Sequence, residues 1–226
     1  MIGDVILDRY WLGEVRRISP EAPVPIVSVD SIHPRVGGAG NVAANICAFG
    51  AKCNLVTAIG DDKAGREVDQ ILAGHDVNRY LLVDIDSRTI EKLRIISRNQ
   101  QLLRADFESS FSQEVVDRCF HDFLELLPSA NVVVISDYGK GGIGHIEEMI
   151  HVADACGVST VVDPKGSDFT RYSGATVVTP NESELRSVVG PWSCDAQMES
   201  KALDLMNETG IKGLLVTRGA DGMTLY

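Results

Sequence analysis

The sequence lacks the features that mark membrane-spanning, disulfide-stabilised and nucleic-acid-binding proteins. No apolar run approaches the length of a membrane span, and no signal peptide opens the chain. The five cysteines form no Cys-x-x-Cys pair and the five histidines no His-Glu-x-x-His arrangement, so neither a disulfide framework nor a zinc site is indicated. A net charge of −11 argues against nucleic acid or an anionic membrane as the main partner. We therefore expect a cytoplasmic protein.

The hydrophobic pattern is that of an α/β protein. Runs rich in Val, Ile and Leu alternate with helical segments, most regularly after residue 112, which predicts a mostly parallel central sheet with helices on both faces. The expected strands are 55–59, 80–83, 132–136, 160–162, 176–179 and 213–217, and the expected helices are 63–73, 112–126, 143–155, 181–188 and 196–208. Residues 223–226 are expected to form the first strand of a hairpin.

Two segments interrupt this alternation. Residues 10–36 contain four prolines among β-prone residues, and residues 88–106 alternate in polarity around an Arg98-Asn99 turn. These two insertions predict a small β-sheet lid on a single domain spanning 1–226. The second insertion carries the basic residues Lys92, Arg94, Arg98 and Arg104, which stand out in an acidic protein. A basic solvated hairpin is the alternative interpretation.

A glycine cluster, Gly37-Gly38-Ala39-Gly40-Asn41, precedes a run of small residues that is expected to form a helix ending at Gly50. Glycines at a helix entrance let a ligand approach the backbone, and Asn41 adds a donor and an acceptor there. A glycine turn before a buried helix explains the cluster equally well. A dinucleotide-dependent oxidoreductase is disfavoured, because Ala43 stands where the dinucleotide fingerprint needs its third glycine.

Polar clusters follow four predicted strands, at 136–141, 163–166, 179–184 and 217–222. The carboxyl ends of parallel strands share one sheet edge, where ligands of such sheets bind, and Asp8 is expected just beyond the first strand at that edge. Lys140 and Lys165 are point charges suited to phosphate, and glycines in the last cluster permit close backbone approach. The pattern therefore predicts a cleft for a phosphorylated or nucleotide ligand.

The third of these clusters has two interpretations. Asn181 and Glu184 have the spacing of an N-cap residue and the N3 residue that bonds back to it. The same two side chains, one helical turn apart, also suit a hydrated Mg²⁺, which prefers carboxylates and waters to a full protein cage.

Together these residues resemble the ribokinase, or PfkB-type, family of carbohydrate kinases. The resemblance rests on Gly-Asp-x-x-x-Asp at 3–8, Gly-Gly-Ala-Gly-Asn at 37–41, Thr-Pro-Asn-x-x-Glu at 179–184 and Val-Thr-Arg-Gly-x-x-Gly at 216–222. Within that family, segments 17–25, 93–102 and 163–169 resemble those of bacterial D-glycero-β-D-manno-heptose 7-phosphate kinases. The resemblance implies transfer of the ATP γ-phosphate to the anomeric C1 hydroxyl of that sugar, for ADP-heptose and lipopolysaccharide core synthesis. Another sugar substrate of the same family is the alternative.

The resemblance also implies site residues and partners. The residues implied for sugar hydroxyls are Asp8, Gly37, Gly38 and Asn41, and those implied for the 7-phosphate are Arg98 and Lys165. The residues implied for ATP are Asn181, Glu182, Ser183, Glu184, Thr217 and Gly219, with Glu184 also directed at Mg²⁺. The lid is expected to serve as a homodimer interface.

One family motif is missing from residues 1–226. The Gly-Ala-Gly-Asp sequence, which in this family carries the anion hole and the general-base aspartate, does not occur. We therefore expect a ribokinase-like domain that lacks its C-terminal part and, as this chain alone, is inactive. A chain that only binds sugar phosphate or a partner is the non-enzymatic alternative.

Overall fold

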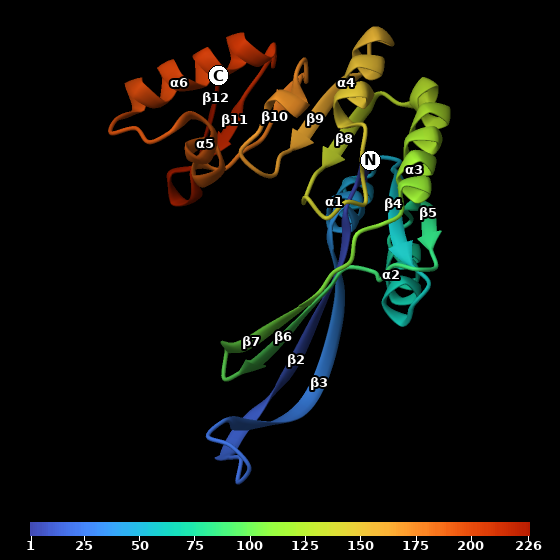
Figure 1. Ribbon diagram of the computed structural model, residues 1–226, viewed down its shortest axis with the longest axis vertical. Helices are drawn as coiled ribbons and strands as arrows, with labels where there is room; N and C mark the ends of the chain where they lie inside the picture. Colours follow the sequence, from blue (N-terminus) through green and yellow to red (C-terminus); the bar gives the residue numbers. More distant parts are fainter.

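The computed structural model describes residues 1–226 and contains a large parallel sheet with helices on both faces (Figure 1). The strand order is β10-β9-β8-β1-β4-β5, and every neighbouring pair is parallel. The strands are β1 (Ile2–Gly3), β4 (Asn54–Gly60), β5 (Asn78–Asp84), β8 (Val132–Ser136), β9 (Ser159–Asp163) and β10 (Val177–Val178). The predicted parallel sheet is confirmed.

A short hairpin, β11 (Leu215–Thr217) and β12 (Met223–Leu225), lies next to β10. Single parallel bridges, from Val178 to Leu214 and from Asn181 to Thr217, align β11 with the large sheet. The strand expected at 223–226 is β12, which pairs antiparallel with β11 and is therefore the second strand of this hairpin.

Two hydrophobic clusters cover the two faces of the large sheet. In β4, Leu55 and Ile59 belong to one cluster, whereas Val56 and Ala58 belong to the other. This alternation follows from the two-residue period of a strand and explains why nearly every residue of β4 is apolar. The helices are α1 (Ala39–Ala48), α2 (Lys63–Ala73), α3 (Gln113–Leu126), α4 (Ile146–Ala155), α5 (Glu182–Val189) and α6 (Asp195–Thr209). None is long and apolar enough to span a membrane.

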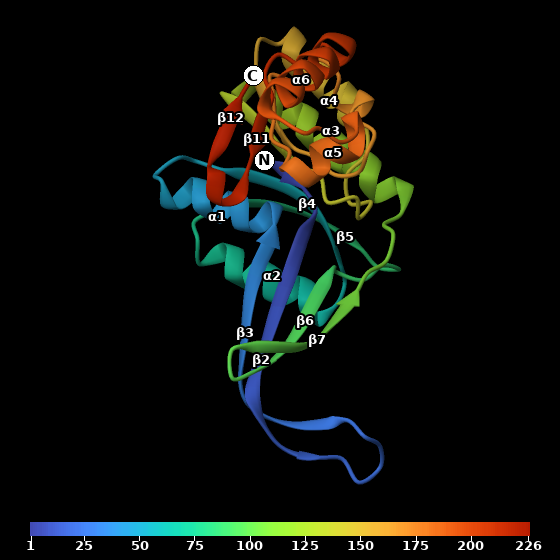
Figure 2. The ribbon, with the colours of Figure 1, turned by 90° about the vertical axis from the view of Figure 1, so that its left-hand side faces the viewer.

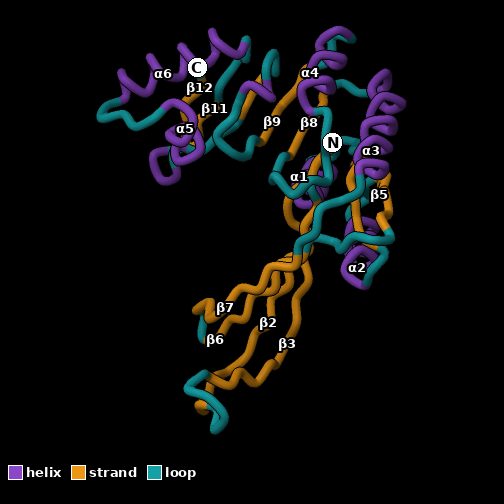
Figure 3. The backbone as a smooth tube through the Cα atoms, viewed as in Figure 1, coloured by secondary structure: helices purple, strands orange, loops and turns teal.

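A second, four-stranded sheet projects away from the helices (Figures 1 and 3). Its strands, in the order β3-β2-β6-β7, are β2 (Val5–Ile18), β3 (Pro25–Gly38), β6 (Glu91–Ser97) and β7 (Gln100–Phe107). The strands expected within 10–36 and 88–106 therefore exist and pair with one another. At the β6–β7 turn, Arg98 and Asn99 both have positive φ, of 50° and 63°, as a tight two-residue hairpin requires.

Two local boundaries differ from expectation. Asp8 lies within β2 and not beyond a strand end, because only Asp4 separates β1 from β2 and the chain changes sheets there. Helix α1 begins at Ala39, so Gly40 and Asn41 form its first turn; Gly38, with φ 55°, ends β3. At its other end Phe49 is the C-cap, and Gly50 follows it with φ 84°.

Polar side chains tie the second sheet to the helices at its base. Arg9 on β2 donates to Glu67 on α2 at 2.6 Å and also to Glu91 on β6. Asp62, the N-cap of α2, accepts from Gly65 N at 2.7 Å, from Thr89 N at 2.9 Å and from the Thr89 hydroxyl. Thr89 immediately precedes β6, so one carboxylate both caps a helix and holds the entrance to the second sheet.

Replacing Asp62 with Ala should lower the free energy of unfolding by about 2 kcal/mol, because the cap and the contact with Thr89 are lost together. Urea denaturation of the full-length gene product measures this. Asp61→Ala is the matched control, since the Asp61 side chain is 56% exposed and pairs only with Arg66. An equal loss of unfolding free energy in both variants would contradict the role of Asp62 as cap of α2 and partner of Thr89.

The difference in unfolding free energy between wild type and Asp62→Ala should depend on pH. Burial raises the pKa of Asp62, but the hydrogen bonds from Gly65 and Thr89 outweigh it, and the net pKa is lowered. A carboxylate with a lowered pKa stabilises the fold above the unfolded-state pKa, which is about 3.9 for Asp. That stabilisation is lost as the pH falls through the folded-state pKa. The gap between wild type and Asp62→Ala should therefore be full at pH 7 and shrink below pH about 4.

Candidate functional site

The order of the large sheet reverses at β1. The chain moves outward from β1 through β4 to β5 on one side and from β8 through β9 to β10 on the other. Such a reversal leaves a crevice at the carboxyl ends of the two strands that flank it, and open α/β sheets bind ligands there. The crevice between β1 and β8 is therefore the place where this fold is expected to act.

Asp4 organises that crevice. Its carboxylate, 1% exposed, accepts hydrogen bonds from the backbone N–H groups of Tyr138 at 3.0 Å, Lys140 at 3.1 Å and Gly142 at 3.0 Å. Burial raises the pKa of Asp4 and the three N–H groups oppose that rise, while the negative charge of Asp137 adds to it. One buried carboxylate from the end of β1 thus fixes the loop that follows β8.

The residues implied for sugar binding lie beside β1. Asp8 on β2 forms an ion pair with Arg94 on β6. A Cβ atom on Gly38 would lie 2.3 Å from the Asp4 carbonyl oxygen, and its φ is 55°, so this position needs glycine. A Cβ atom on Gly37 would lie 2.3 Å from Oδ2 of Asp8 and would displace that carboxylate. Asn41 follows in the first turn of α1 and is exposed. The structure therefore gathers a carboxylate, a glycine pair and an exposed amide in one place.

The strand-end residues form a cavity of about 350 Å³ on the other side of the crevice. Its lining comes from the ends of β8, β9, β10 and β11 and from the start of α5. The lining residues are Asp137, Tyr138, Asp163, Pro164, Lys165, Thr179, Asn181, Glu184 and Thr217. Lys165, Asn181, Glu184 and Thr217, four of the predicted site residues, are therefore brought together.

Both interpretations of the Asn181 and Glu184 pair are compatible with the geometry. Asn181 Oδ1 accepts from Glu184 N at 2.9 Å and Glu184 Oε2 accepts from Asn181 N at 3.0 Å, which completes a capping box. The other carboxylate oxygen, Oε1, lies 3.6 Å from Lys165 Nζ in the cavity. The cap thus holds Glu184 in position while one oxygen remains available to a ligand.

The cavity suits a hydrated Mg²⁺ better than a fully caged metal. No group of three or more His, Cys, Asp or Glu side chains is arranged to hold a metal ion. Burial and the negative charge of Glu184 raise the pKa of Asp163, which shows that these carboxylates are close enough to repel each other. A cation that keeps its waters and contacts one or two carboxylates would relieve this repulsion.

A buried tyrosine supports the floor of the cavity. The Tyr172 hydroxyl donates to Asp137 Oδ2 at 2.7 Å and accepts from Lys165 N at 3.0 Å, and burial together with the Asp137 contact raises its pKa. Arg171 approaches the same Asp137 oxygen at 3.4 Å. Asp137 is 3% exposed, so its carboxylate is held by these neighbours and joins β8 to β9.

Several predicted residues lie outside the cavity. Glu182 pairs with Arg218 at 3.1 Å, and Ser183 and Gly219 do not line the cavity. The Lys140 ammonium pairs with Glu108 at 2.7 Å, which neutralises the charge expected to serve phosphate. Arg98 is exposed in the turn between β6 and β7, and in Figure 1 this turn lies well apart from the carboxyl end of β9.

Sequence reasoning named the clusters but missed individual residues within them. Asp137, Tyr138 and Asp163 stand in the polar segments that follow predicted strands, and Asp4 stands in the Gly-Asp-x-x-x-Asp motif at 3–8. The sequence could therefore predict the segments that contain these residues. It could not predict which of the residues would be buried against the end of another strand. Tyr172 had no signal, because it lies in a short 3-10 helix (Thr170–Tyr172) distant in sequence from Asp137.

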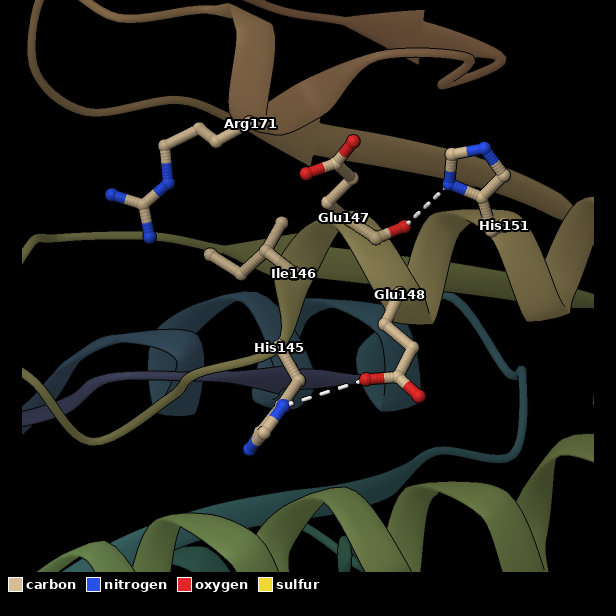
Figure 4. A pocket seen from close by; sticks show the side chains of 6 residues that line it. All are labelled: His145, Ile146, Glu147, Glu148, His151 and Arg171. Carbon is tan, nitrogen blue, oxygen red and sulfur yellow. Dashed lines mark hydrogen bonds and ion pairs between the residues drawn. The ribbon is translucent and has the colours of Figure 1, made fainter.

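A larger, open cavity of about 570 Å³ lies at the start of α4 (Figure 4). Its lining residues are His145, Ile146, Glu147, Glu148, His151 and Arg171. His145 pairs with Asp117 at 2.8 Å and lies 3.5 Å from Glu148, and no predicted site residue contributes. The smaller cavity, which collects the strand-end residues, is therefore the candidate ligand site.

Comparison with known proteins identifies similar sequences along the whole chain. The family model described as pfkB family carbohydrate kinase matches residues 1–226. The bifunctional protein HldE of Proteus mirabilis (strain HI4320) is 45% identical over 225 residues, and that of Erwinia tasmaniensis is 47% identical over 225 residues. These alignments cover 100% of this chain but 48% and 47% of the relatives, so the chain spans about half their length.

Solved structures show the same fold at low identity. Phosphofructokinase-2 from Escherichia coli in complex with fructose-6-phosphate superposes with a TM-score of 0.81 at 19% identity, over 100% of this chain and 76% of that one. Ribokinase from Arabidopsis thaliana complexed with ribose and ATP gives 0.75 at 19% identity, over 100% and 73%.

Proposed function

The chain belongs to the pfkB family of carbohydrate kinases, and we propose that it carries most of a kinase acting on D-glycero-D-manno-heptose 7-phosphate. The ribokinase-type family inferred from the motifs is thereby confirmed. The proposed reaction transfers the γ-phosphate of ATP to the anomeric C1 hydroxyl and yields the 1,7-bisphosphate. The specific sugar rests on the resemblance of segments 17–25, 93–102 and 163–169.

The observation that carries a kinase assignment is the division of one sheet edge into two parts. A carboxylate and a glycine pair, Asp8 with Gly37 and Gly38, lie on the β1 side of the crevice. A cavity with Lys165 and Glu184 lies on the β8 to β11 side. Phosphoryl transfer needs a polyol and a polyphosphate held in line, and these two parts supply suitable donors and acceptors for each.

The residues of the cavity are proposed to position ATP. Lys165 would neutralise phosphate charge, while Glu184, held by its cap to Asn181, would orient the waters of a bound Mg²⁺. The Mg²⁺ ion, when bound, supplies charge neutralisation for the transferred phosphoryl group. Thr217, exposed at the end of β11 and bridged to Asn181, would donate its hydroxyl to a phosphate oxygen.

The first test is phosphotransfer by the full-length gene product with heptose 7-phosphate and Mg-ATP. In that protein, Asn41→Ala should lower kcat/KM for the sugar by about tenfold and leave the KM for ATP unchanged, because one amide contact with a hydroxyl is lost. An equal effect on the kinetics of both substrates would contradict the proposed position of Asn41 at the sugar. Turnover of a different sugar alone would overturn the heptose assignment and leave the family intact.

Glu184→Gln tests the proposed metal role separately from the cap. Glutamine at N3 still accepts from the N-cap N–H, so the urea midpoint should be preserved. The Mg²⁺ concentration needed for half-maximal activity should rise between about 10- and 100-fold, because the carboxylate charge is gone. Glu182→Gln is the matched control, since Glu182 pairs with Arg218 outside the cavity. Similar Mg²⁺ dependence in both variants would reject the role of Glu184.

The second sheet supports a proposed homodimer. Strand register places Ile32, Trp11, Ile95 and Leu103 in one row on one face of this sheet. Ile32 is 50% exposed and Leu103 57%, and no helix covers the sheet at this distance from its base (Figures 1 and 3). Trp11 and Ile95, between these two, are half-buried, so the row is apolar throughout and exposed to water at both ends. An apolar row of this kind favours association, and a second copy offers the same row in return.

Leu103→Glu should therefore shift the full-length gene product from dimer to monomer in sedimentation velocity, because it buries a charge in the proposed interface. Leu203→Glu, a comparable substitution at a 44% exposed leucine on α6, should leave the sedimentation coefficient unchanged. A wild-type protein that sediments as a monomer would reject the proposal.

A further inference from the structure

The face of the second sheet opposite the apolar row is strongly charged. Strand register aligns Arg35, Asp8, Lys92 and Asp106 in one row across all four strands. The next row outward contains His33, Tyr10, Arg94 and Arg104. Side chains that pair directly across neighbouring strands share a face, so these eight residues form one surface.

Contacts between the side chains confirm that surface. Arg94 pairs with Asp8, and the guanidinium carbons of Arg35 and Arg94 lie 5.5 and 5.2 Å from the centre of the Tyr10 ring. Arg9, the neighbour of Asp8 in β2, points the other way and pairs with Glu67 on α2. In Figure 2, α2 lies behind the second sheet, and the charged surface therefore faces the side on which β11 and β12 lie.

Two cations on this surface have no carboxylate partner. Asp8 is neutralised by Arg94, and Asp106 by Arg104 at 2.8 Å. Arg35 and Lys92 form no ion pair within 4.0 Å, although Lys92 is half-buried. A protein with a net charge of −11 therefore keeps two uncompensated positive charges on either side of Asp8, which is the arrangement expected for an anionic ligand.

Distances along the strands favour this pair over Arg98. Arg35 and Lys92 each lie one strand spacing, about 5 Å, from Asp8. Arg98 lies six residues beyond Lys92, which corresponds to about 20 Å along β6. A monosaccharide with its hydroxyls at Asp8 can reach the nearer pair but not the hairpin tip of the same chain.

We propose that Arg35 and Lys92 bind the phosphate group of a phosphorylated sugar substrate and make the enzyme prefer it to the unphosphorylated sugar. This inference rests on the proposed sugar-kinase function and on Asp8 as a sugar ligand, but not on the identity of the sugar. Arg35 lies on β3 and Lys92 on β6, the two strands that flank β2, so the two cations would contact the phosphate from opposite sides. The Asp8–Arg94 ion pair between them adds no net charge.

The test compares kcat/KM for heptose 7-phosphate and for unphosphorylated heptose in the full-length gene product. Arg35→Gln and Lys92→Gln should each lower kcat/KM for the phosphorylated sugar by about tenfold, with little change for the unphosphorylated sugar or in the KM for ATP. Arg16→Gln is the control, because Arg16 is a 78% exposed cation on β2 that pairs with Glu14. Urea midpoints establish that each variant is folded.

Three results would overturn the inference. They are a wild-type enzyme with no preference for the phosphorylated sugar, equal losses on both sugars in the two variants, and a preference abolished by Arg98→Gln while Arg35→Gln and Lys92→Gln retain it. If the wild type uses another sugar, the same comparison is made with fructose 6-phosphate and fructose. In that case the heptose assignment fails, whereas the role of Arg35 and Lys92 is still decided.

Discussion

The three hydrogen bonds to the Asp4 carboxylate hold the candidate site together. They join the end of β1 to the loop after β8, the two strands between which the sheet order reverses. A carboxylate that is 1% exposed is costly to bury, and it is tolerated here because N–H donors from Tyr138, Lys140 and Gly142 surround it. These contacts add to the parallel pairing of β1 with β8, and together they fix the loop after β8 relative to the end of β1.

The second sheet has two chemically different faces because its strands alternate strictly. Neighbouring residues of β2 illustrate this: Asp8 and Tyr10 lie on the charged face, whereas Arg9 faces α2 and Trp11 joins the apolar row. The proposed sugar site and the proposed dimer interface therefore lie on opposite faces of one strand. The hydrogen bonds of Asp62 and Thr89 at the base of the sheet set its position relative to the helices.

Much of the fold could be predicted from local pattern. The helix at 63–73 and the strand at 132–136 agree with α2 and β8, because amphipathic period and unbroken β-branched runs are strong signals. The start of α1 was misplaced, since glycines do not show whether they precede a helix or form its first turn. Asp8 was placed beyond a strand because the two-residue β1 and the change of sheet at Asp4 leave no trace in hydrophobicity.

The sequence by itself determined the parallel α/β class, the family and the polar segments of the site, because these depend on local period and on short motifs. Only the tertiary structure decided which members of those segments meet. The pairing of Asp8 with Arg94, the burial of Asp137 under Tyr172 and the alignment of Arg35 with Lys92 all join residues far apart in the chain. Strand order and register set such contacts, and neither is encoded in any one segment.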